Sequence, residues 1–110
     1  MIKCLYILLL TTFISCNQDK NNLVSANKFS EIISNDKSVI IIDVRTPDEF
    51  NKGHLKNSLN VNWFDENFDE NLNIFSKDLP VMVYCLSGGR SSKANERIKS
   101  LGFKNVYELD

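Results

Sequence analysis

The sequence predicts an α/β fold with a doubly wound, mostly parallel sheet. Residues 38–44 form a continuous run rich in β-branched side chains, which is typical of a strand buried on both faces. A second apolar run, residues 81–84, stops at Cys85 and leads through two glycines into a segment with helical spacing. Strands that alternate with short helices favour parallel pairing through crossover helices.

Two helix starts are recognisable in the first half of the domain. Ser25 can cap a helix whose apolar side chains recur at helical spacing. These side chains are Phe29, Ile32 and Ile33. Thr46 begins a second helix, because it forms a capping box with Glu49 around a proline in the first turn. This helix is short and ends near Gly53.

The middle of the chain predicts a short strand and a third helix. Residues 59–61 form the strand, and the helix follows Trp63. One face of the helix is apolar, with Phe64, Phe68, Leu72 and Phe75. Its acidic side chains are interpreted as a solvated face, with a metal site as the alternative. They are Asp65, Glu66, Asp69 and Glu70.

The C-terminal third contains a strand, a loop, a helix and a last strand. The strand begins after Pro80, and the helix is expected to open at Ser91 and to end at Gly102. The apolar positions of this helix are Ala94, Ile98 and Leu101. Residues 106–109 complete the sheet.

The loop after the predicted strand of residues 81–84 is the candidate reactive site. Cys85 lies where the strand ends, and Gly88 and Gly89 let the backbone curl closely around a ligand. Backbone N–H groups in such a loop, in front of a helix, attract anions and favour thiolate over thiol. A small buried cysteine beside an ordinary turn is the alternative. The order of cysteine, glycine pair, arginine and helix start favours a reactive thiol.

The N-terminal residues predict a leader. Lys3 precedes an apolar stretch, residues 5–14, that is short for a membrane span. The segment that ends Phe13-Ile14-Ser15-Cys16 resembles a bacterial lipoprotein signal. The resemblance implies a signal peptide over residues 1–15, lipid on Cys16 and a tether over residues 16–22. We therefore expect a lipid anchor in the cell envelope, facing the periplasm or exterior; an ordinary cleaved signal and an uncleaved anchor are the alternatives.

The charge balance and the cysteine content bear on which partners and which disulfides the protein can have. Thirteen lysines and arginines oppose fourteen aspartates and glutamates; without Lys3, twelve remain, giving a net charge of −2. Nothing in this balance predicts nucleic-acid binding. Of Cys4, Cys16 and Cys85, only Cys85 would stay a free thiol after processing, so no internal disulfide is expected.

Two motifs together resemble the single-domain rhodaneses, a family of sulfurtransferases. The first is Ile42-Asp43-Val44-Arg45-Thr46-Pro47-Asp48-Glu49-Phe50 with Gly53-His54-Leu55 and Asn57-Ser58-Leu59-Asn60-Val61. The second runs from Tyr84-Cys85 to Arg90-Ser91-Ser92. The resemblance covers residues 23–110 and implies a rhodanese-like domain there. It implies five strands in the order 3-2-4-5-1, with the reactive loop after strand four. That loop would lie beside strand two, where the strand order reverses.

The resemblance also implies a role for each site residue. Cys85 would take sulfur from a sulfane donor (thiosulfate, a persulfide or a polysulfide) and pass it to a thiol or cyanide. The backbone of the loop would bind the substrate sulfur; it comprises Leu86, Ser87, Gly88, Gly89, Arg90 and Ser91. Asp43 and Arg45 would brace the site, and His54 matches a structural position rather than a general base. No metal or organic cofactor is implied.

Loop length separates this chemistry from phosphate chemistry. Six residues run from Cys85 to Arg90, as in sulfurtransferases, whereas the related dual-specificity phosphatases use a loop one residue longer. Leu86 and Ser87 are neutral where thiosulfate-specialised loops often carry a basic residue, which weakens the case for thiosulfate as natural donor.

The end of the chain predicts an incomplete cover for the sheet. Family members usually continue past the last strand into a glycine pair and a helix, but this chain stops at Asp110. We therefore expect a C-terminally truncated domain with one sheet face partly uncovered, which a protein partner could cover. This feature favours the alternative function, a non-catalytic rhodanese-like binding module tethered at the membrane.

The lipoprotein-type signal predicts that a fatty acid is attached at Cys16. Metabolic labelling with a fatty acid should mark the wild-type protein and Cys4→Ala, because Cys4 leaves with the signal. Cys16→Ala should carry no label. Label that persists in Cys16→Ala would refute lipidation at this residue.

Overall fold

A computed structural model describes residues 22–110 of the chain. The signal of residues 1–15, the lipidation site Cys16 and the tether up to residue 21 lie outside the described residues. None of the helices in residues 22–110 has the length and apolar character of a membrane span. The elements are β1 (Leu23–Val24), α1 (Ala26–Asn35), β2 (Ile40–Asp43), α2 (Pro47–Lys52), β3 (Ser58–Asn60), α3 (Phe68–Leu72), β4 (Val81–Tyr84), α4 (Gly89–Ser100) and β5 (Val106–Leu109).

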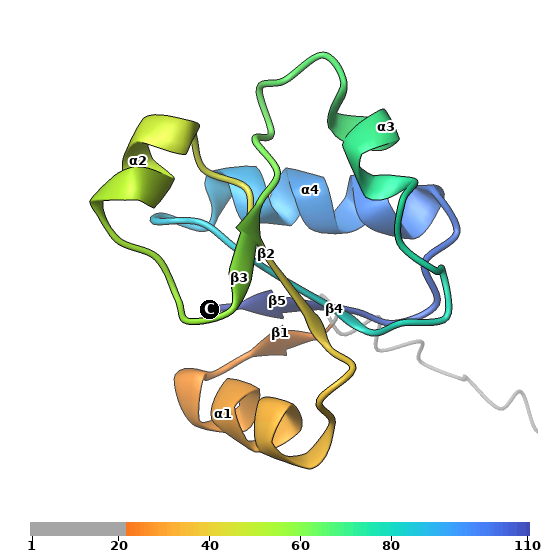
Figure 1. Ribbon diagram of the computed structural model, residues 1–110. Helices are drawn as coiled ribbons and strands as arrows, with labels where there is room; N and C mark the ends of the chain where they lie inside the picture. Colours follow the sequence, from red (N-terminus) through yellow and green to blue (C-terminus); the bar gives the residue numbers. More distant parts are fainter. Residues whose placement is uncertain (1–21) are drawn as a thin grey trace, which may run out of the picture.

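The sheet has five strands in the order β1-β5-β4-β2-β3, and all neighbouring pairs are parallel (Figure 1). Read from the opposite edge, this is the order 3-2-4-5-1, so the predicted fold class and topology are confirmed. In the register of β2 and β4, Asp43 is opposite Tyr84. The segments that follow these two strands therefore leave the sheet side by side, at its carboxyl edge.

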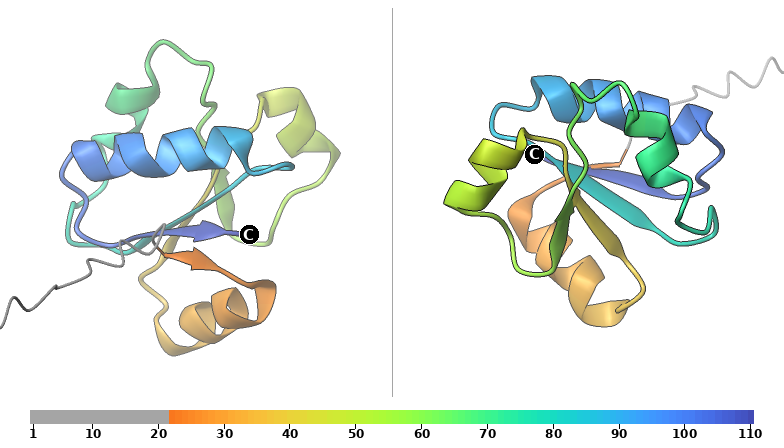
Figure 2. Two further views of the ribbon diagram at one scale, coloured as in Figure 1. Left: turned by 180° about the vertical axis from the view of Figure 1, so that it is seen from behind. Right: turned by 45° about the horizontal axis from the view of Figure 1, so that its top comes forward.

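Helices cover both faces of the sheet, as a doubly wound fold requires. α2, α3 and α4 lie on one side and α1 lies on the other (Figures 1 and 2). Side chains of β2 and β4 alternate between the two sides, as strand geometry dictates. Ile42 and Val83 pack with Ile98 of α4, whereas Ile41 and Met82 pack with Phe29 of α1.

Local capping signals predicted the first two helices correctly. The Ser25 side chain accepts a hydrogen bond from the Lys28 N–H at the start of α1. The Thr46 side chain accepts from the Glu49 N–H, and the Glu49 side chain reaches back to the Thr46 N–H. Gly53 ends α2, as expected.

The third helix is shorter than predicted. α3 begins only at Phe68, and Phe64 is 68% exposed, so its expected place on the buried face is wrong. The side chain of Asn62 accepts from the Phe64 N–H at 3.1 Å, and that of Asp65 accepts from the Asn67 N–H at 2.9 Å. Such local bonds offer the backbone an alternative to helix. Phe68 and Leu72 are buried, as predicted.

The fourth helix starts earlier than expected. α4 begins at Gly89, with Gly88 as its cap in the left-handed region at φ 82°, and Ser91 lies in the first turn rather than at the opening. Glycine adopts this conformation without the steric penalty of a Cβ, so the chain turns from loop into helix within one residue. The Ser91 side chain consequently faces inward, and the residue is fully buried.

The face of the sheet under α1 is covered less completely at β5. Tyr107 and Leu109 are partly buried and pack on the cluster that contains Phe29 and Met82. The protein partner expected over this face stays a prediction.

A buried ion pair holds the carboxyl end of β2. Arg45 Nη2 lies 2.7 Å from Asp43 Oδ2, and Arg45 Nε donates to Asp43 Oδ1 at 2.9 Å. Asp43 is fully buried and Arg45 is 7% exposed. Arg45 Nη2 also donates to the Gly53 carbonyl at 2.6 Å, which ties the end of α2 to the end of β2.

Asp43→Asn should lower the free energy of unfolding by about 3–5 kcal/mol, because it leaves the buried Arg45 guanidinium without its counter-charge. Denaturant unfolding measures the difference. Glu31→Gln is the control, because it breaks the exposed Lys28–Glu31 pair and should change stability by less than about 1 kcal/mol. Equal effects of the two substitutions would contradict a bracing role for the Asp43–Arg45 pair.

Candidate active site

The candidate site lies at the carboxyl edge of the sheet, where the strand order reverses between β4 and β2. Cys85 follows β4 directly, and four residues separate β4 from α4. Because β4 is buried along its whole length, the start of this loop is fixed by the core. The loop therefore presents its cysteine at the position where open α/β sheets bind ligands.

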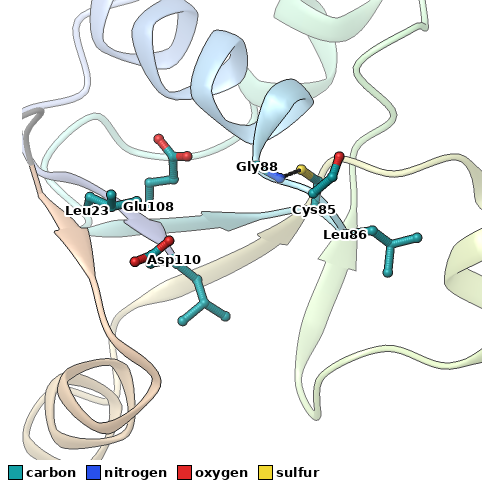
Figure 3. A pocket seen from close by; sticks show the side chains of 8 residues that line it. Leu23, Cys85, Leu86, Gly88, Glu108 and Asp110 are labelled. Carbon is teal, nitrogen blue, oxygen red and sulfur yellow. Dashed lines mark hydrogen bonds between the residues drawn. The ribbon is translucent and has the colours of Figure 1, made fainter.

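Backbone N–H groups converge on the Cys85 sulfur. Gly88 N–H donates to Sγ at 3.1 Å (Figure 3), and Ser91 N–H donates to it at 3.3 Å. The thiol itself is 3.3 Å from Ser91 Oγ. Cys85 is half-buried, so the sulfur combines a polar cradle with access from solvent. This arrangement suits a sulfur atom that carries negative charge.

Two opposing effects set the pKa of the Cys85 thiol. Burial raises the pKa, because it disfavours the charged form. Hydrogen bonds from the Ser91 hydroxyl and from the backbone N–H groups of Ser91, Ser87 and Gly88 lower it, and their sum prevails. The pKa of the thiol therefore lies below its ordinary value, and the thiolate fraction at neutral pH is raised.

The six predicted loop residues take different positions. Ser87, Gly88 and Ser91 direct backbone N–H groups to the sulfur. Leu86 is 71% exposed (Figure 3), and Gly89 is the first residue of α4. Backbone contact with the sulfur therefore comes from part of the predicted set.

Arg90 faces α2 rather than the thiol. Its Nη1 and Nη2 donate to Glu49 Oε1 and Oε2 at 2.7 and 3.0 Å, and its guanidinium lies 5.7 Å from the Phe64 ring centroid. This two-pronged contact joins the first turn of α4 to the first turn of α2. The Arg90 hydrogen bonds lower the pKa of Glu49 to about 2.

The residues expected to brace the site contact each other and the residue before Cys85. Arg45 is paired with Asp43, and its guanidinium lies 5.9 Å from the ring centroid of Tyr84, the residue before Cys85. His54 stacks on Phe50 with ring centroids 3.6 Å apart, and its Nδ1 is 2.8 Å from the Phe50 carbonyl oxygen. These contacts give His54 a local partner within its own turn.

A cavity of about 260 Å³ opens beside the thiol (Figure 3). Glu108 and Asp110 of the last strand segment contribute to it, and the sequence interpretation did not include them. Period-two alternation in residues 106–109 places Glu108 on the same face as the buried Val106, and a carboxylate there was the available signal. The full lining is Leu23, Cys85, Leu86, Ser87, Gly88, Glu108, Leu109 and Asp110.

The described part of the chain lacks the side-chain clusters that usually bind metal ions. Residues 22–110 contain no group of three or more histidine, cysteine, aspartate or glutamate side chains placed to hold an ion. The chemistry available at this edge of the sheet is that of a thiolate in a cradle of N–H donors.

Comparison with protein families and curated proteins identifies similar sequences. The model of the rhodanese-like domain family matches residues 25–110. The chain is 36% identical over 74 residues to the thiosulfate sulfurtransferase GlpE of Shewanella oneidensis, covering 67% of this chain and 71% of that protein. It is 39% identical over 98 residues to the tRNA uridine(34) hydroxylase of Pelagibacter ubique, covering 87% of this chain but only 32% of that longer protein.

Solved structures show the same fold. The crystal structure of a rhodanese-related protein from Thermoplasma volcanium has a TM-score of 0.69 at 29% identity, covering 81% of this chain and 83% of that one. The human single-domain sulfurtransferase has a TM-score of 0.66 at 18% identity, covering 80% and 88% respectively. At that lower identity the likeness concerns the fold alone.

Glu49→Gln should lower the free energy of unfolding at neutral pH. In strong acid the variant and the wild type should be equally stable. Pairing with Arg90 lowers the pKa of Glu49 from 4.5 to about 2, so its stabilising effect is complete above pH 4.5 and disappears as the pH falls toward 2. Denaturant unfolding at stepwise lower pH should show the difference from wild type shrinking across this window.

Asp48→Asn is the matched control for the Glu49 substitution. Asp48 is an exposed acid in the same first turn of α2, and the recorded ion pairs of residues 22–110 do not include it. A stability difference for Glu49→Gln that is constant with pH, or matched by Asp48→Asn, would contradict the bracing contact.

Proposed function

The chain belongs to the rhodanese-like domain family, and we propose on this basis that it is a sulfurtransferase whose Cys85 carries a sulfane sulfur. The observation that carries the proposal is the convergence of the Gly88 and Ser91 N–H groups on Cys85 Sγ. Those donors can hold a sulfur anion, and the positive charge of Arg90 interacts with Cys85 as well. The six-residue length from Cys85 to Arg90 supports a sulfur substrate rather than a phosphate ester.

The first half-reaction loads the enzyme. The Cys85 thiolate attacks the outer sulfur of the donor, a new S–S bond forms at Sγ, and the bond from that sulfur to the rest of the donor breaks. The leaving group departs with the electron pair, as sulfite from thiosulfate or as a thiolate from a persulfide. The N–H groups of Ser87, Gly88 and Ser91 stabilise the anionic persulfide.

The second half-reaction unloads it. A thiolate or cyanide attacks the outer sulfur of the persulfide, and the bond to Sγ breaks. The electron pair returns to Cys85, which is again a thiolate held by the loop. Arg90 keeps the loop in place through Glu49 and adds positive charge that interacts with Cys85.

The cavity favours a singly charged persulfide over thiosulfate as donor. Its lining includes the carboxyl side chains of Glu108 and Asp110, and the loop residues beside Cys85 are the neutral Leu86 and Ser87. A doubly charged anion meets like charge there, which disfavours its approach. We further propose that lipid on Cys16 places this activity at the cell envelope.

Cys85→Ser should reduce sulfur transfer to the uncatalysed background and should gain no sulfur, because the alkoxide of serine is not available at neutral pH. Intact mass spectrometry after exposure to a polysulfide should show one added sulfur atom in the wild type. Transfer to cyanide measures turnover. Cys16→Ala is the control: it removes the other cysteine expected in the mature protein and should keep both the added sulfur and the turnover.

Three outcomes would contradict this proposal. Substantial turnover in Cys85→Ser would remove the cysteine from the mechanism. A wild type that gains no sulfur, or that hydrolyses an aryl phosphate faster than it transfers sulfur, would favour a binding module or a phosphatase instead.

A further inference from the structure

Glu108 is a buried carboxyl group that the sulfur-transfer steps do not use. It lies on β5, is 7% exposed, and extends toward α4 beside the cavity (Figure 3). Ser91 Oγ donates to its Oε2 at 3.2 Å, and Asn95 Nδ2 donates to its Oε1 at 3.2 Å. Both donors are neutral. Burial of a carboxyl group costs free energy unless hydrogen bonds compensate it. One of the two donors to Glu108, the Ser91 hydroxyl, is also the partner of the Cys85 thiol.

The Ser91 hydroxyl joins Glu108 to Cys85. It has one proton, and three acceptors lie within reach: Cys85 Sγ at 3.3 Å, the Gly88 carbonyl at 3.2 Å and Glu108 Oε2 at 3.2 Å. A hydroxyl that donates to Glu108 Oε2 accepts a hydrogen bond from the Cys85 thiol. A hydroxyl that donates to the sulfur leaves Glu108 Oε2 without this donor.

We propose that Glu108 is a positioning residue that competes with the Cys85 sulfur for the single proton of the Ser91 hydroxyl. While the hydroxyl donates to Glu108 Oε2, it gives the sulfur no hydrogen bond. Removal of this competition leaves the hydroxyl free to donate to Cys85 Sγ and to stabilise the thiolate.

The groups around Glu108 hold its carboxyl group next to the Ser91 hydroxyl. Asn95 uses its amide N–H on Oε1, while its own Oδ1 is buried without a partner in the described residues, so Glu108 fixes the orientation of this amide. The sheet neighbours of Glu108 are the apolar Leu23 on β1 and Val83 on β4. The other titratable groups that line the shared cavity are Cys85 and Asp110.

The test is the pKa of Cys85 in the full-length protein carrying Glu108→Gln. Alkylation by iodoacetamide is followed at the Cys85 peptide by mass spectrometry across a pH series. Asn95 holds Oε1, so the glutamine Nε2 faces Ser91 and pins the hydroxyl on the sulfur. Loss of the carboxylate charge acts in the same direction. The thiol pKa should fall by about one unit.

Two variants separate the hydroxyl path from general electrostatics. Asp110→Asn removes a carboxylate from the same cavity that has no recorded contact with Ser91, and it should shift the pKa much less. In a Ser91→Ala background, most of the effect of Glu108→Gln should disappear. An unshifted pKa in Glu108→Gln, an equal shift in Asp110→Asn, or a full shift without the hydroxyl would each overturn the proposal.

A second measurement covers the case in which Glu108→Gln fails to fold. The ¹³C chemical shift of Glu108 Cδ in the wild type should change when Cys85 ionises, because the Ser91 hydroxyl then donates to the thiolate instead of to Glu108 Oε2. A Glu108 signal that stays constant while Cys85 ionises would overturn the proposal. This inference rests on the proposed sulfur transfer for its biological role, but its test measures only the pKa of Cys85. A shifted pKa in Glu108→Gln, in a protein that forms no persulfide, would refute the sulfurtransferase alone.

Discussion

The candidate site depends on backbone N–H groups that converge on the Cys85 sulfur, directly after the buried strand β4. Gly88, at φ 82°, turns the chain so that its own N–H and that of Ser91 meet at Cys85 Sγ while α4 begins at the next residue. This turn works only if its two ends are fixed. β4 fixes one end from the centre of the sheet, and the Arg90–Glu49 pair fixes the other against α2.

The chemistry follows from a balance between burial and hydrogen bonding at the thiol. Burial alone raises the pKa of Cys85 and would leave an unreactive thiol. Donors from the loop outweigh it, but one of them, the Ser91 hydroxyl, is shared with Glu108. A carboxyl group on β5 and a cysteine after β4 therefore share one rotatable hydroxyl.

Local signals made most of the fold predictable from the sequence. The Thr46 capping box, the β-branched run before Asp43 and the cysteine–glycine loop each depend on neighbours in the chain, and each appears where expected. Phe64 was misplaced because Asn62 and Asp65 bond the backbone locally and delay the helix.

The parts of the site that were missed depend on contacts between distant segments. Glu108 acquires its role only from the packing of α4 on β5, which brings Ser91 and Asn95 to its carboxyl group. The start of α4 at Gly89 depends on the left-handed backbone of Gly88, which leaves Ser91 free to face inward. The alternation in residues 106–109 places Glu108 on the buried face, but no short stretch of sequence places it beside Ser91.

A crystal structure of the protein after treatment with a polysulfide tests the central claim most directly. We expect one additional sulfur bonded to Cys85 Sγ, with the N–H groups of the loop between β4 and α4 directed at it and Arg90 still paired with Glu49. An unmodified Cys85, or an added sulfur that points away from those N–H groups, would contradict the account.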